Sequence, residues 1–337
     1  MPVASIDPPP GPCYNRLGAV RILDLAGASV SEIVVIGSLN MDLVVRAPRL
    51  PSPGETVRGE AFRTIPGGKG ANQAAAIALL GQPVTMLGRV GDDAFGEQLA
   101  QNLGAKGVDP AHLLATVGVA TGTATIIVDA AGQNSIVIAP GANGQVTPQD
   151  VDDCDGLLRQ ARYLVLQLEI PLETVAHAID KAARHGVQVV LNPAPAAQLP
   201  ARLLSRVRYL VPNESEAQWL TGLPVSDAGS AARAADRLRQ QGAHTVIITL
   251  GSQGAYVASP DGSFHMPVPE VTVVDTTAAG DAFIGGLVVA LSRGLSLRDA
   301  VRYASCAGAL AVTRFGAQTS LPSGAEVERL FQAFRPA

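Results

Sequence analysis

Short apolar runs that alternate with helical segments constrain the fold of this chain more than any other feature. The run 33–37, Ile-Val-Val-Ile-Gly, is continuously apolar and ends at a glycine, which is typical of a strand buried on both faces. Further strand-like runs lie at 84–87, 163–168, 187–191, 208–211 and 245–250. Helical segments lie at 70–80, 94–106, 172–185, 214–220, 231–241, 282–293, 297–313 and 324–334. This alternation predicts an α/β fold, with a doubly wound, mostly parallel sheet that carries helices on both faces.

Two pairs of segments do not fit this alternation. The first pair, 43–46 and 56–65, has a more polar, alternating pattern, and a Pro-Ser-Pro-Gly sequence separates its members. The second pair, 123–128 and 135–138, flanks another turn-rich segment. We predict that both pairs belong to one small β-lid, which is formed by two insertions into the α/β fold. The insertions cover residues 40–66 and 120–140.

The first thirty residues differ from the rest of the chain. A proline-rich run at 8–12 stands where a signal peptide would carry basic residues, and Arg21 and Asp24 interrupt the later apolar stretch. We therefore expect residues 1–30 to form a disordered N-terminal extension. Residues 31–337 are then expected to form one domain.

Composition and charge exclude several classes of function. Hydrophobic residues make up 47% of the 337 residues, so the chain can bury a sizeable core. The net charge is −4 and there is no dense basic run, so we expect no nucleic-acid partner. No apolar run reaches the roughly 18 residues of a membrane helix, so we expect no membrane association. Cys13, Cys154 and Cys306 lie too far apart for a disulfide framework or a zinc motif, which fits a cytoplasmic protein.

The segment 274–283, Val-Asp-Thr-Thr-Ala-Ala-Gly-Asp-Ala-Phe, carries the strongest chemical signal. It follows a strand-like run at 271–273 and leads into an apolar helix. Small residues at 278–280 stand where the helix begins, so backbone N–H groups without helical partners could hold a phosphate or an oxyanion. Asp281, in the first turn, could then accept a proton from an alcohol. The alternative is an ordinary helix start with an acid stabilised by the helix dipole.

A second segment, 67–73, reads Gly-Gly-Lys-Gly-Ala-Asn-Gln and opens the helix 70–80. Glycines let the backbone approach a polyol closely, and the Asn72 amide can both donate to and accept from hydroxyl groups. The segment matches neither the Walker A loop nor the dinucleotide-binding fingerprint. The alternative is a glycine-rich helix start without a ligand.

Polar side chains at the predicted strand ends form a third group of candidates. Asn40 and Asp42 follow the first strand and would point the same way on an extended segment. Glu169 follows the strand 163–168, and a carboxylate there needs a partner. Because ligands bind beyond the carboxyl ends of strands in open α/β sheets, these groups could clamp adjacent hydroxyls. The alternative for Asn40 and Asp42 is a polar turn.

Two more strand ends could serve a nucleotide. Asn213 and Glu216 follow the strand 208–211, where they could serve phosphate and magnesium or simply form a helix capping box. The segment 249–254, Thr-Leu-Gly-Ser-Gln-Gly, ends another strand with two glycines. Nucleotide phosphates could lie against its bare backbone, although an ordinary turn would look the same.

Taken together, these segments resemble the ribokinase-like family of carbohydrate and nucleoside kinases, from about Glu32 to the C-terminus. Segment 67–73 is similar to the N-terminal signature of the family, and segment 275–281 to its C-terminal signature. The resemblance implies an ATP-dependent kinase that phosphorylates D-ribose at its 5-hydroxyl, with ATP and Mg²⁺ as cofactors.

The resemblance also assigns roles to single residues. Asp281 is implied to be the catalytic base, beside an anion hole of the Ala279, Gly280 and Asp281 backbone N–H groups. The implied sugar contacts are Asn40, Asp42, Gly67, Gly68, Lys69, Asn72, Glu169 and Asp281. The implied contacts with ATP and magnesium are Asn213, Glu216, Thr249, Gly251, Ser252, Gly254, Gly280 and Ser305.

A K⁺ site and a homodimer follow from the same resemblance. The helix before Gly316 ends with carbonyl groups that lack helical partners, and such oxygens can replace the hydration shell of a monovalent cation. The implied potassium residues are Asp275, Thr277, Ala311, Arg314, Gly316 and Ser320. Dimerisation through the β-lid would cover its exposed strand edges.

Some alternatives stay open. Ser305 stands where relatives often carry a larger polar residue that touches adenine, which leaves the nucleotide preference open. The substrate could also be another sugar or a nucleoside, such as deoxyribose, fructose or adenosine. A non-catalytic sugar-binding regulator on the same fold is a further alternative, although Asp281 argues against it because a pure binder needs no base.

Overall fold

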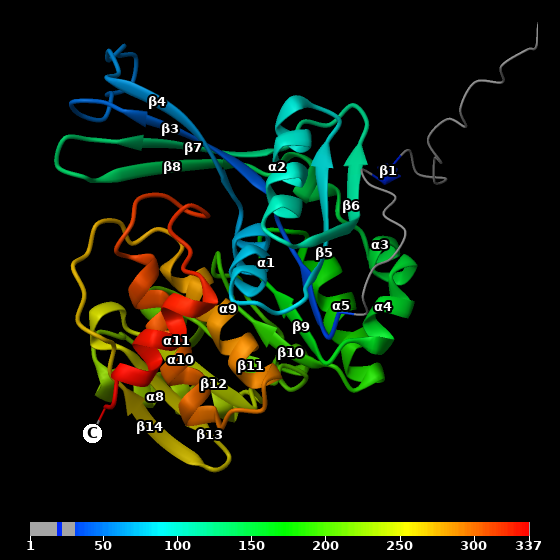
Figure 1. Cartoon of the computed structure of the whole chain (residues 1–337), viewed down its shortest axis with the longest axis vertical. Helices are drawn as coiled ribbons and strands as arrows, with labels where there is room; N and C mark the ends of the chain where they lie inside the picture. The colour runs from blue at the N-terminus through cyan, green and yellow to red at the C-terminus, as the bar shows by residue number, and fades with distance from the viewer. Residues whose placement is uncertain (1–18, 22–30, 337) are drawn as a thin grey trace, which may run out of the picture.

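The computed structural model describes residues 19–21 and 31–336, which form a ten-stranded sheet and a separate four-stranded sheet (Figure 1). In spatial order, the strands of the large sheet are β1 (Ala19–Arg21), β6 (Asp109–Thr116), β5 (Thr85–Gly91), β2 (Ile33–Ile36), β9 (Tyr163–Leu166), β10 (Gln188–Leu191), β11 (Tyr209–Leu210), β12 (Thr245–Thr249), β13 (Ala255–Ser259) and β14 (Gly262–Met266). All pairs from β6 to β12 are parallel, and only the edges are antiparallel. The predicted doubly wound, mostly parallel sheet is confirmed.

Helices cover both faces of the large sheet. Successive side chains of a strand point to opposite faces, so continuously apolar strands present apolar side chains on both. Val35 of β2, and the strand residues that point to the same face of the sheet, pack against one set of helices. These are α1 (Lys69–Leu79), α2 (Ala94–Ala105), α9 (Ala279–Ser292), α10 (Leu297–Ala311) and α11 (Gly324–Ala333). Val34 and Ile36 face the other set, α3 (Pro148–Asp153), α4 (Asp155–Gln160), α5 (Leu172–His185), α6 (Ala201–Leu204), α7 (Glu214–Thr221) and α8 (Ala228–Gln240). Two hydrophobic cores therefore sandwich a sheet that is buried on both faces.

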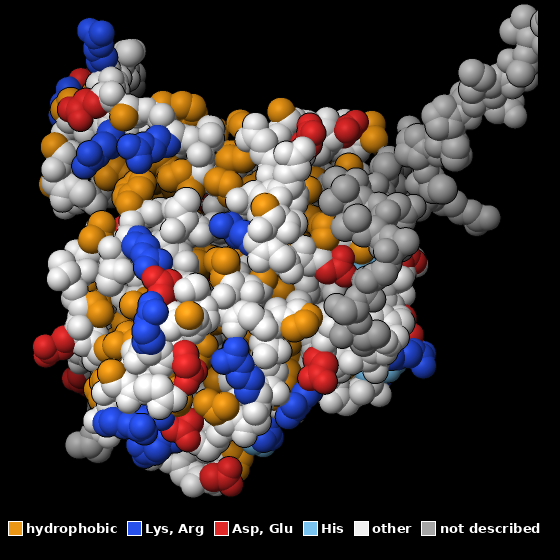
Figure 2. Space-filling view, viewed as in Figure 1, with side chains coloured by type: hydrophobic (Ala, Val, Ile, Leu, Met, Phe, Trp, Pro, Cys, Tyr) orange, Lys and Arg blue, Asp and Glu red, His pale blue; other side chains and the backbone are white. Residues whose placement is uncertain are grey.

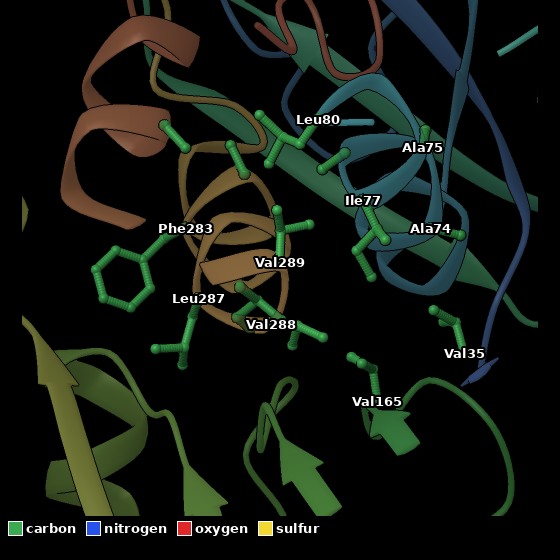
Figure 3. Packing of buried hydrophobic residues seen from close by; sticks show 14 of the residues in the cluster. Val35, Ala74, Ala75, Ile77, Leu80, Val165, Phe283, Leu287, Val288 and Val289 are labelled. Atoms are coloured by element: carbon green, nitrogen blue, oxygen red, sulfur yellow. The ribbon is translucent and has the colours of Figure 1, made fainter. Parts of the chain in front are cut away.

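Helices α1 and α9 pack unusually closely. A Cβ added to Gly285 of α9 would lie 2.6 Å from the Cβ of Ala76 in α1, so only glycine allows this approach. Figure 3 shows Ile77 of α1, and Leu80 directly after α1, beside Val288 and Val289 of α9, above the strand residue Val165. The first turns of both helices, which carry the two signature segments, thereby lie side by side.

The predicted β-lid is the four-stranded sheet, in the order β4 (Ala61–Gly67), β3 (Asn40–Arg46), β7 (Gly122–Val128) and β8 (Asn134–Ala139). Strands β3 and β7, from the two insertions, pair in parallel. At the root of the lid, Asn40 is in register with both Gly67 and Gly122. The lid also touches the C-terminal part of the chain, where the Arg63 guanidinium lies 5.7 Å from the ring centroid of Phe315.

Several details of the sequence interpretation were wrong. Residues 56–60 are not a strand, because β4 begins only at Ala61. Residues 271–273 form no strand either, since β14 already ends the sheet and Val273 is 60% exposed. Strand β6 and helices α3 and α4 were not predicted.

The N-terminal extension is described only in part. Within residues 1–30, the structure describes the segment 19–21, which pairs antiparallel with β6. The disorder of the extension stays a prediction. The remaining residues of the predicted extension lie outside the described part of the chain. None of the described helices combines the length and the apolar character needed to cross a membrane.

Candidate active site

Asp281 lies in the first turn of α9, and the start of α1 holds its carboxylate. Asn72 Nδ2 donates to Oδ2 of Asp281 and Gln73 Nε2 donates to Oδ1, both at 2.9 Å. Asp281 is 7% exposed, so its carboxylate has little contact with bulk water. The close packing of α1 against α9 is what brings residues more than two hundred positions apart into contact.

The charges around Asp281 are crowded. Burial raises the pKa of Asp281, while the Lys69 ammonium and the hydrogen bonds from Asn72 and Gln73 act in the opposite direction. Burial alone would lower the pKa of Lys69, but the carboxylates of Asp281, Glu169 and Glu216 outweigh burial and raise it. One half-buried cation thus stands among several carboxylates, which is typical of a site with acid–base chemistry.

Asp42 adds a further carboxylate to this crowd. Burial, with the nearby charges of Glu169 and Asp281, raises the pKa of Asp42 to about 7. A Cβ on Gly67 would lie 2.4 Å from Oδ2 of Asp42, so glycine leaves the space that this carboxylate occupies. Gly68, with φ +89°, adopts a conformation that other residues rarely adopt, and its backbone packs against the start of β3.

Buried or partly buried hydrogen bonds fix the side chains of Glu169 and Asn40. Glu169 Oε2 accepts from the Ser38 hydroxyl at 2.5 Å and from the Lys69 backbone N–H at 3.1 Å, which supplies the partners that its position requires. Asn143 Nδ2 donates to Oδ1 of Asn40 at 2.7 Å, which orients the Asn40 amide. Among the described residues, the buried Oδ1 of Asn72 has no hydrogen-bond partner.

The turn before α9 presents backbone N–H groups beside Asp281. Ala278 caps the helix in the left-handed conformation, with φ 60°, and the Ala279 N–H donates to the Thr276 carbonyl at 3.3 Å. In the part of the chain that the structure describes, the Gly280 and Asp281 N–H groups have no acceptor. A Cβ at Gly280 would meet no heavy atom within 4 Å, so space for a ligand lies beside this residue.

A cavity of about 210 Å³ opens on this turn. Its walls come from the starts of α1, α7 and α9 and from the carboxyl ends of β10, β11 and β12. The lining residues are Lys69, Asn192, Val211, Asn213, Glu216, Thr249, Thr276, Ala278, Ala279, Gly280, Asp281 and Ile284. An anionic group in this cavity would meet the free N–H groups of α9 and the Lys69 ammonium. The residues present therefore fit the phosphates of a nucleotide.

Asn213 and Glu216 do form the capping box that was the alternative to a ligand role. Asn213 Oδ1 accepts from the Glu216 N–H at 2.8 Å, and Glu216 Oε2 accepts from the Asn213 N–H at 2.9 Å. Both residues nevertheless line the cavity. Burial raises the pKa of Glu216, against the hydrogen bond from Asn213 and the charge of Lys69. The cap thus leaves a carboxylate at the cavity wall, which suits water-mediated contact with Mg²⁺.

The other nucleotide candidates differ in position. Thr249 lines the cavity, whereas Gly251 and Ser252 lie on the exposed 3₁₀ turn Gly251–Gln253 beyond β12. Gly254, with φ +88°, leaves no room for a side chain, because a Cβ would lie 2.0 Å from the Met266 carbonyl oxygen. Ser305 is buried within α10, away from the cavity lining. The structure therefore does not bring Ser305 together with the other candidates.

The two segments assigned to potassium do meet. Asp275 accepts from the Thr277 N–H through Oδ1 and from the Gly316 N–H through Oδ2, both at 2.9 Å. Partial burial alone would raise the pKa of Asp275, but the hydrogen bond from the Thr277 hydroxyl, together with these two N–H bonds, lowers it. Ser320 is buried and donates to the Ala317 carbonyl at 2.9 Å.

The other potassium candidates would offer backbone carbonyl groups. The Ala311 carbonyl accepts from the Arg314 N–H at 3.5 Å, and the Arg314 side chain pairs with Glu326 instead of pointing into the turn. Among the described residues, no group of three or more His, Cys, Asp and Glu side chains could hold a metal ion. This donor set of carbonyls, one hydroxyl and one carboxylate fits a large monovalent cation.

Several polar residues at the site were missed by the sequence interpretation. Gln73, Gln167 and Asn192 form a buried set of amides under Asp281, while Ser38 and Asn143 support Glu169 and Asn40. Gln167 and Asn192 each directly follow a buried strand, which is the signal that identified Glu169. That signal could have found Asn192, whereas Gln167 fell inside the predicted strand 163–168, which ends at Leu166 in the structure.

Comparison with known proteins places this geometry in a family context. Residues 30–324 match the family described as pfkB family carbohydrate kinase. The ribokinase of Schizosaccharomyces pombe is 44% identical over 310 residues, which cover 89% of this chain and 98% of that protein. The deoxyribokinase of Salmonella typhimurium is 40% identical over 293 residues, which cover 87% of this chain and 96% of that protein.

The fold agrees with a solved structure as well. The structure of Arabidopsis thaliana ribokinase complexed with ribose and ATP matches this chain with a TM-score of 0.85 and 34% identity. The match covers 90% of this chain and 99% of that chain. Sequence and fold are thus similar to the same group of sugar kinases over almost the whole described structure.

Proposed function

This chain belongs to the pfkB family of carbohydrate kinases, and we propose that it transfers the γ-phosphoryl group of ATP to the 5-hydroxyl of D-ribose. One observation carries the proposal. The buried Asp281 carboxylate and the acceptor-free N–H groups of Gly280 and Asp281 lie together, between the polar sugar-side residues and the phosphate-sized cavity. Such an arrangement provides a base and an anion hole at the point where a hydroxyl would meet a phosphoryl group.

The residues divide the work in a simple way. Asp281 would orient the sugar hydroxyl and accept its proton, and the N–H groups of Gly280 and Asp281 would hold charge on the transferred phosphoryl. Asp42, Asn40, Asn72 and Glu169 would bind the other hydroxyls. ATP would bind in the cavity and supply the phosphoryl group, and magnesium, near Asn213 and Glu216, would neutralise charge on the phosphate oxygens.

A second candidate substrate is 2-deoxyribose, because a deoxyribokinase is 40% identical to this chain. The polar sugar side favours the fully hydroxylated ring, since a site built for hydroxyls leaves buried groups unpaired when one is absent. We expect D-ribose to exceed 2-deoxyribose, fructose and adenosine in kcat/KM.

The test is a coupled assay of ADP release with these four substrates, at fixed magnesium and with ATP. The expected result is fastest turnover of D-ribose and near-background turnover by the Asp281→Asn variant. A higher kcat/KM for another substrate would overturn the ribose assignment. Binding of ribose without ADP release would instead favour a non-catalytic sugar-binding regulator.

We also propose that K⁺ binds where Asp275 joins the turn 276–280 to Gly316. A cation there would order the turn that presents the N–H groups of the anion hole. Activity at constant ionic strength should fall when potassium is replaced by choline, and Asp275→Asn should remove the difference. Equal kcat/KM in potassium and in choline would contradict the proposed K⁺ site.

Finally, we propose a cytoplasmic homodimer that forms through the lid. The lid exposes large apolar side chains: Phe62 is 63% exposed, Ile136 52%, Val137 71% and Ile138 47%. Figure 2 shows hydrophobic side chains gathered over the lid strands. Pairing of two lids would cover these side chains and the strand edges. A particle of 34.6 kDa in light scattering at assay concentration would contradict the dimer.

A further inference from the structure

The buried amide of Gln73 is fully used by its neighbours. Gln73 is not exposed at all. Its Nε2 donates to Oδ1 of Asp281 at 2.9 Å and approaches Oδ1 of Asn192 at 3.4 Å. Its Oε1 accepts from Nε2 of Gln167 at 2.6 Å. Every polar group of this side chain therefore has a protein partner, which leaves its amide one orientation.

Sheet register brings the partners of Gln73 together. Leu166 of β9 is paired with Leu191 of β10, so Gln167 and Asn192 follow neighbouring strands at the same level. Gln167 lies close to the backbone after β2, because a Cβ on Gly37 would come within 2.0 Å of Gln167 Oε1. The amides of Gln167 and Asn192 thus stand at the ends of two central parallel strands, and through Gln73 they support the Asp281 carboxylate.

The hydrogen bond from Gln73 ends on the Asp281 carboxylate, which is the proposed catalytic base. We propose that Gln73 is a positioning residue for phosphoryl transfer, which fixes the plane of the Asp281 carboxylate and favours its ionised form. Two donors from adjacent residues of one helix, Asn72 and Gln73, bind the two carboxylate oxygens separately. A carboxylate held at both oxygens cannot rotate, and it presents its remaining lone pairs in fixed directions. This inference rests on the proposed kinase function.

An uncharged donor suits this position, because the charged groups around Asp281 have opposite effects on its ionisation. Lys69 on α1 favours an ionised Asp281, whereas Glu169 beyond β9 opposes it. The charge of Asp281 itself acts on Asp42 in β3 and on Glu216 in α7. A hydrogen bond from an uncharged amide stabilises the carboxylate without adding another charge to this group.

The test compares pH profiles of kcat for wild type and Gln73→Met, which keeps the side-chain volume but removes the donor. Loss of a hydrogen bond to a charged group should move the acidic limb of the profile upward by about one pH unit. The effect should fall mainly on kcat, with the KM for D-ribose within about threefold. An unmoved acidic limb would overturn the inference, even if kcat fell.

Two further variants separate positioning from simple stability. Thr174→Val removes a buried hydrogen bond to the Val146 carbonyl, on the opposite face of the sheet from α1 and α9, and should lower the Tm without moving the acidic limb. Gln167→Met never touches Asp281 but frees the Gln73 amide, so it should move the limb in the same direction by a smaller amount. If Gln73→Met does not fold, an unmoved limb in Gln167→Met overturns the inference instead.

A double variant completes the design. In an Asp281→Asn background, Gln73→Met should cause little further loss of kcat, because no carboxylate remains to be positioned. A full additional loss would mean that Gln73 acts elsewhere, which would overturn the inference. Failure of the kinase proposal is distinguishable, since wild type would then release no ADP with any sugar tested.

Discussion

The proposed sugar side and the proposed nucleotide side of the site are built from different chemical groups. On the sugar side, three carboxylates from β3, the end of β9 and α9 crowd around one ammonium, and all are half-buried or buried. On the nucleotide side, backbone N–H groups, glycines and a helix cap face a cavity of about 210 Å³. Side-chain charges thus dominate the proposed sugar side, whereas backbone groups together with Lys69 and Glu216 line the proposed nucleotide side. Substitutions away from Lys69 and Asp281 should therefore affect one substrate more than the other.

The largest effect should come from Asp281→Asn, where the two sides meet. The amide keeps the shape of the carboxylate but cannot act as a base, so kcat should fall about 10²–10⁴-fold. The KM values for ribose and ATP should change little, because the other contacts on each side remain. Steady-state kinetics with both substrates varied checks this, and near-normal turnover would contradict the role of Asp281.

Gly67→Ala should damage the sugar side alone. The added Cβ would lie 2.4 Å from Oδ2 of Asp42 and displace that carboxylate. A displacement of about 1 Å can cost roughly 10²-fold, which should appear in kcat/KM for ribose and not in the KM for ATP. Gly104→Ala in α2, where a Cβ meets nothing within 4 Å, is the matched control. Equal losses for both substrates would contradict the separation of the two sides.

Asp42 should reveal the energetic cost of crowding on the sugar side. Its pKa is about 7 in the folded protein and 3.8 ordinarily, so the folded state binds the extra proton. The stabilisation is present below pH 4 and is lost as the pH rises through 7. Asp42→Asn does not titrate, so relative to wild type it should gain stability between pH 5 and pH 8, by a few kcal/mol at most.

Denaturant unfolding without sugar at the two pH values measures this gain. The exposed Asp236→Asn in α8 serves as the control, and its stability relative to wild type should be the same at both pH values. A stability difference for Asp42→Asn that does not change with pH would show that Asp42 is not desolvated in the folded protein.

The smallest effect should come from Gly280→Ala, on the nucleotide side. An alanine early in α9 should stabilise the helix by roughly 0.5–1 kcal/mol. Its methyl group would enter the open space beside the free N–H groups, while both donors remain. We expect a loss in kcat of less than about tenfold, since removing a donor outright costs about 10²–10³-fold. A rise in Tm together with unchanged kcat would show that the phosphoryl group does not use this space.

The sequence predicted those parts of the site that are encoded in local patterns. Asp281 at a helix start and the glycines at 67 and 68 follow from short-range chemistry, and the alternation of elements predicted the doubly wound sheet. The role of Gln73 could not be predicted in this way. Its partners Gln167 and Asn192 come from different strands, and only sheet register places them together.

The wrong and untested predictions have similar physical causes. The run 271–273 has the residue composition of a strand but pairs with no strand of either sheet. The chain directly after it contacts the end of α10 instead, where the Val274 N–H donates to the Val312 carbonyl at 2.8 Å. Asn213 and Glu216 satisfy each other as a helix cap, so their sequence pattern cannot distinguish a cap from a ligand site. The role of Ser305 stays a prediction, because a side chain buried in α10 needs some rearrangement to reach a nucleotide.

The register of the lid has a mechanical consequence. Asn40, Gly67 and Gly122 lie abreast at the base of the lid, where the seven-residue strands β3, β4 and β7 meet the body of the protein. Each strand extends about 20 Å from this line. If the lid rotates about this line, its far end moves over a long distance while its base hardly moves. A sugar bound at the base would therefore keep its contacts while the lid moves. The outer part of the lid can change in length or in its contacts without disturbing the residues at the base.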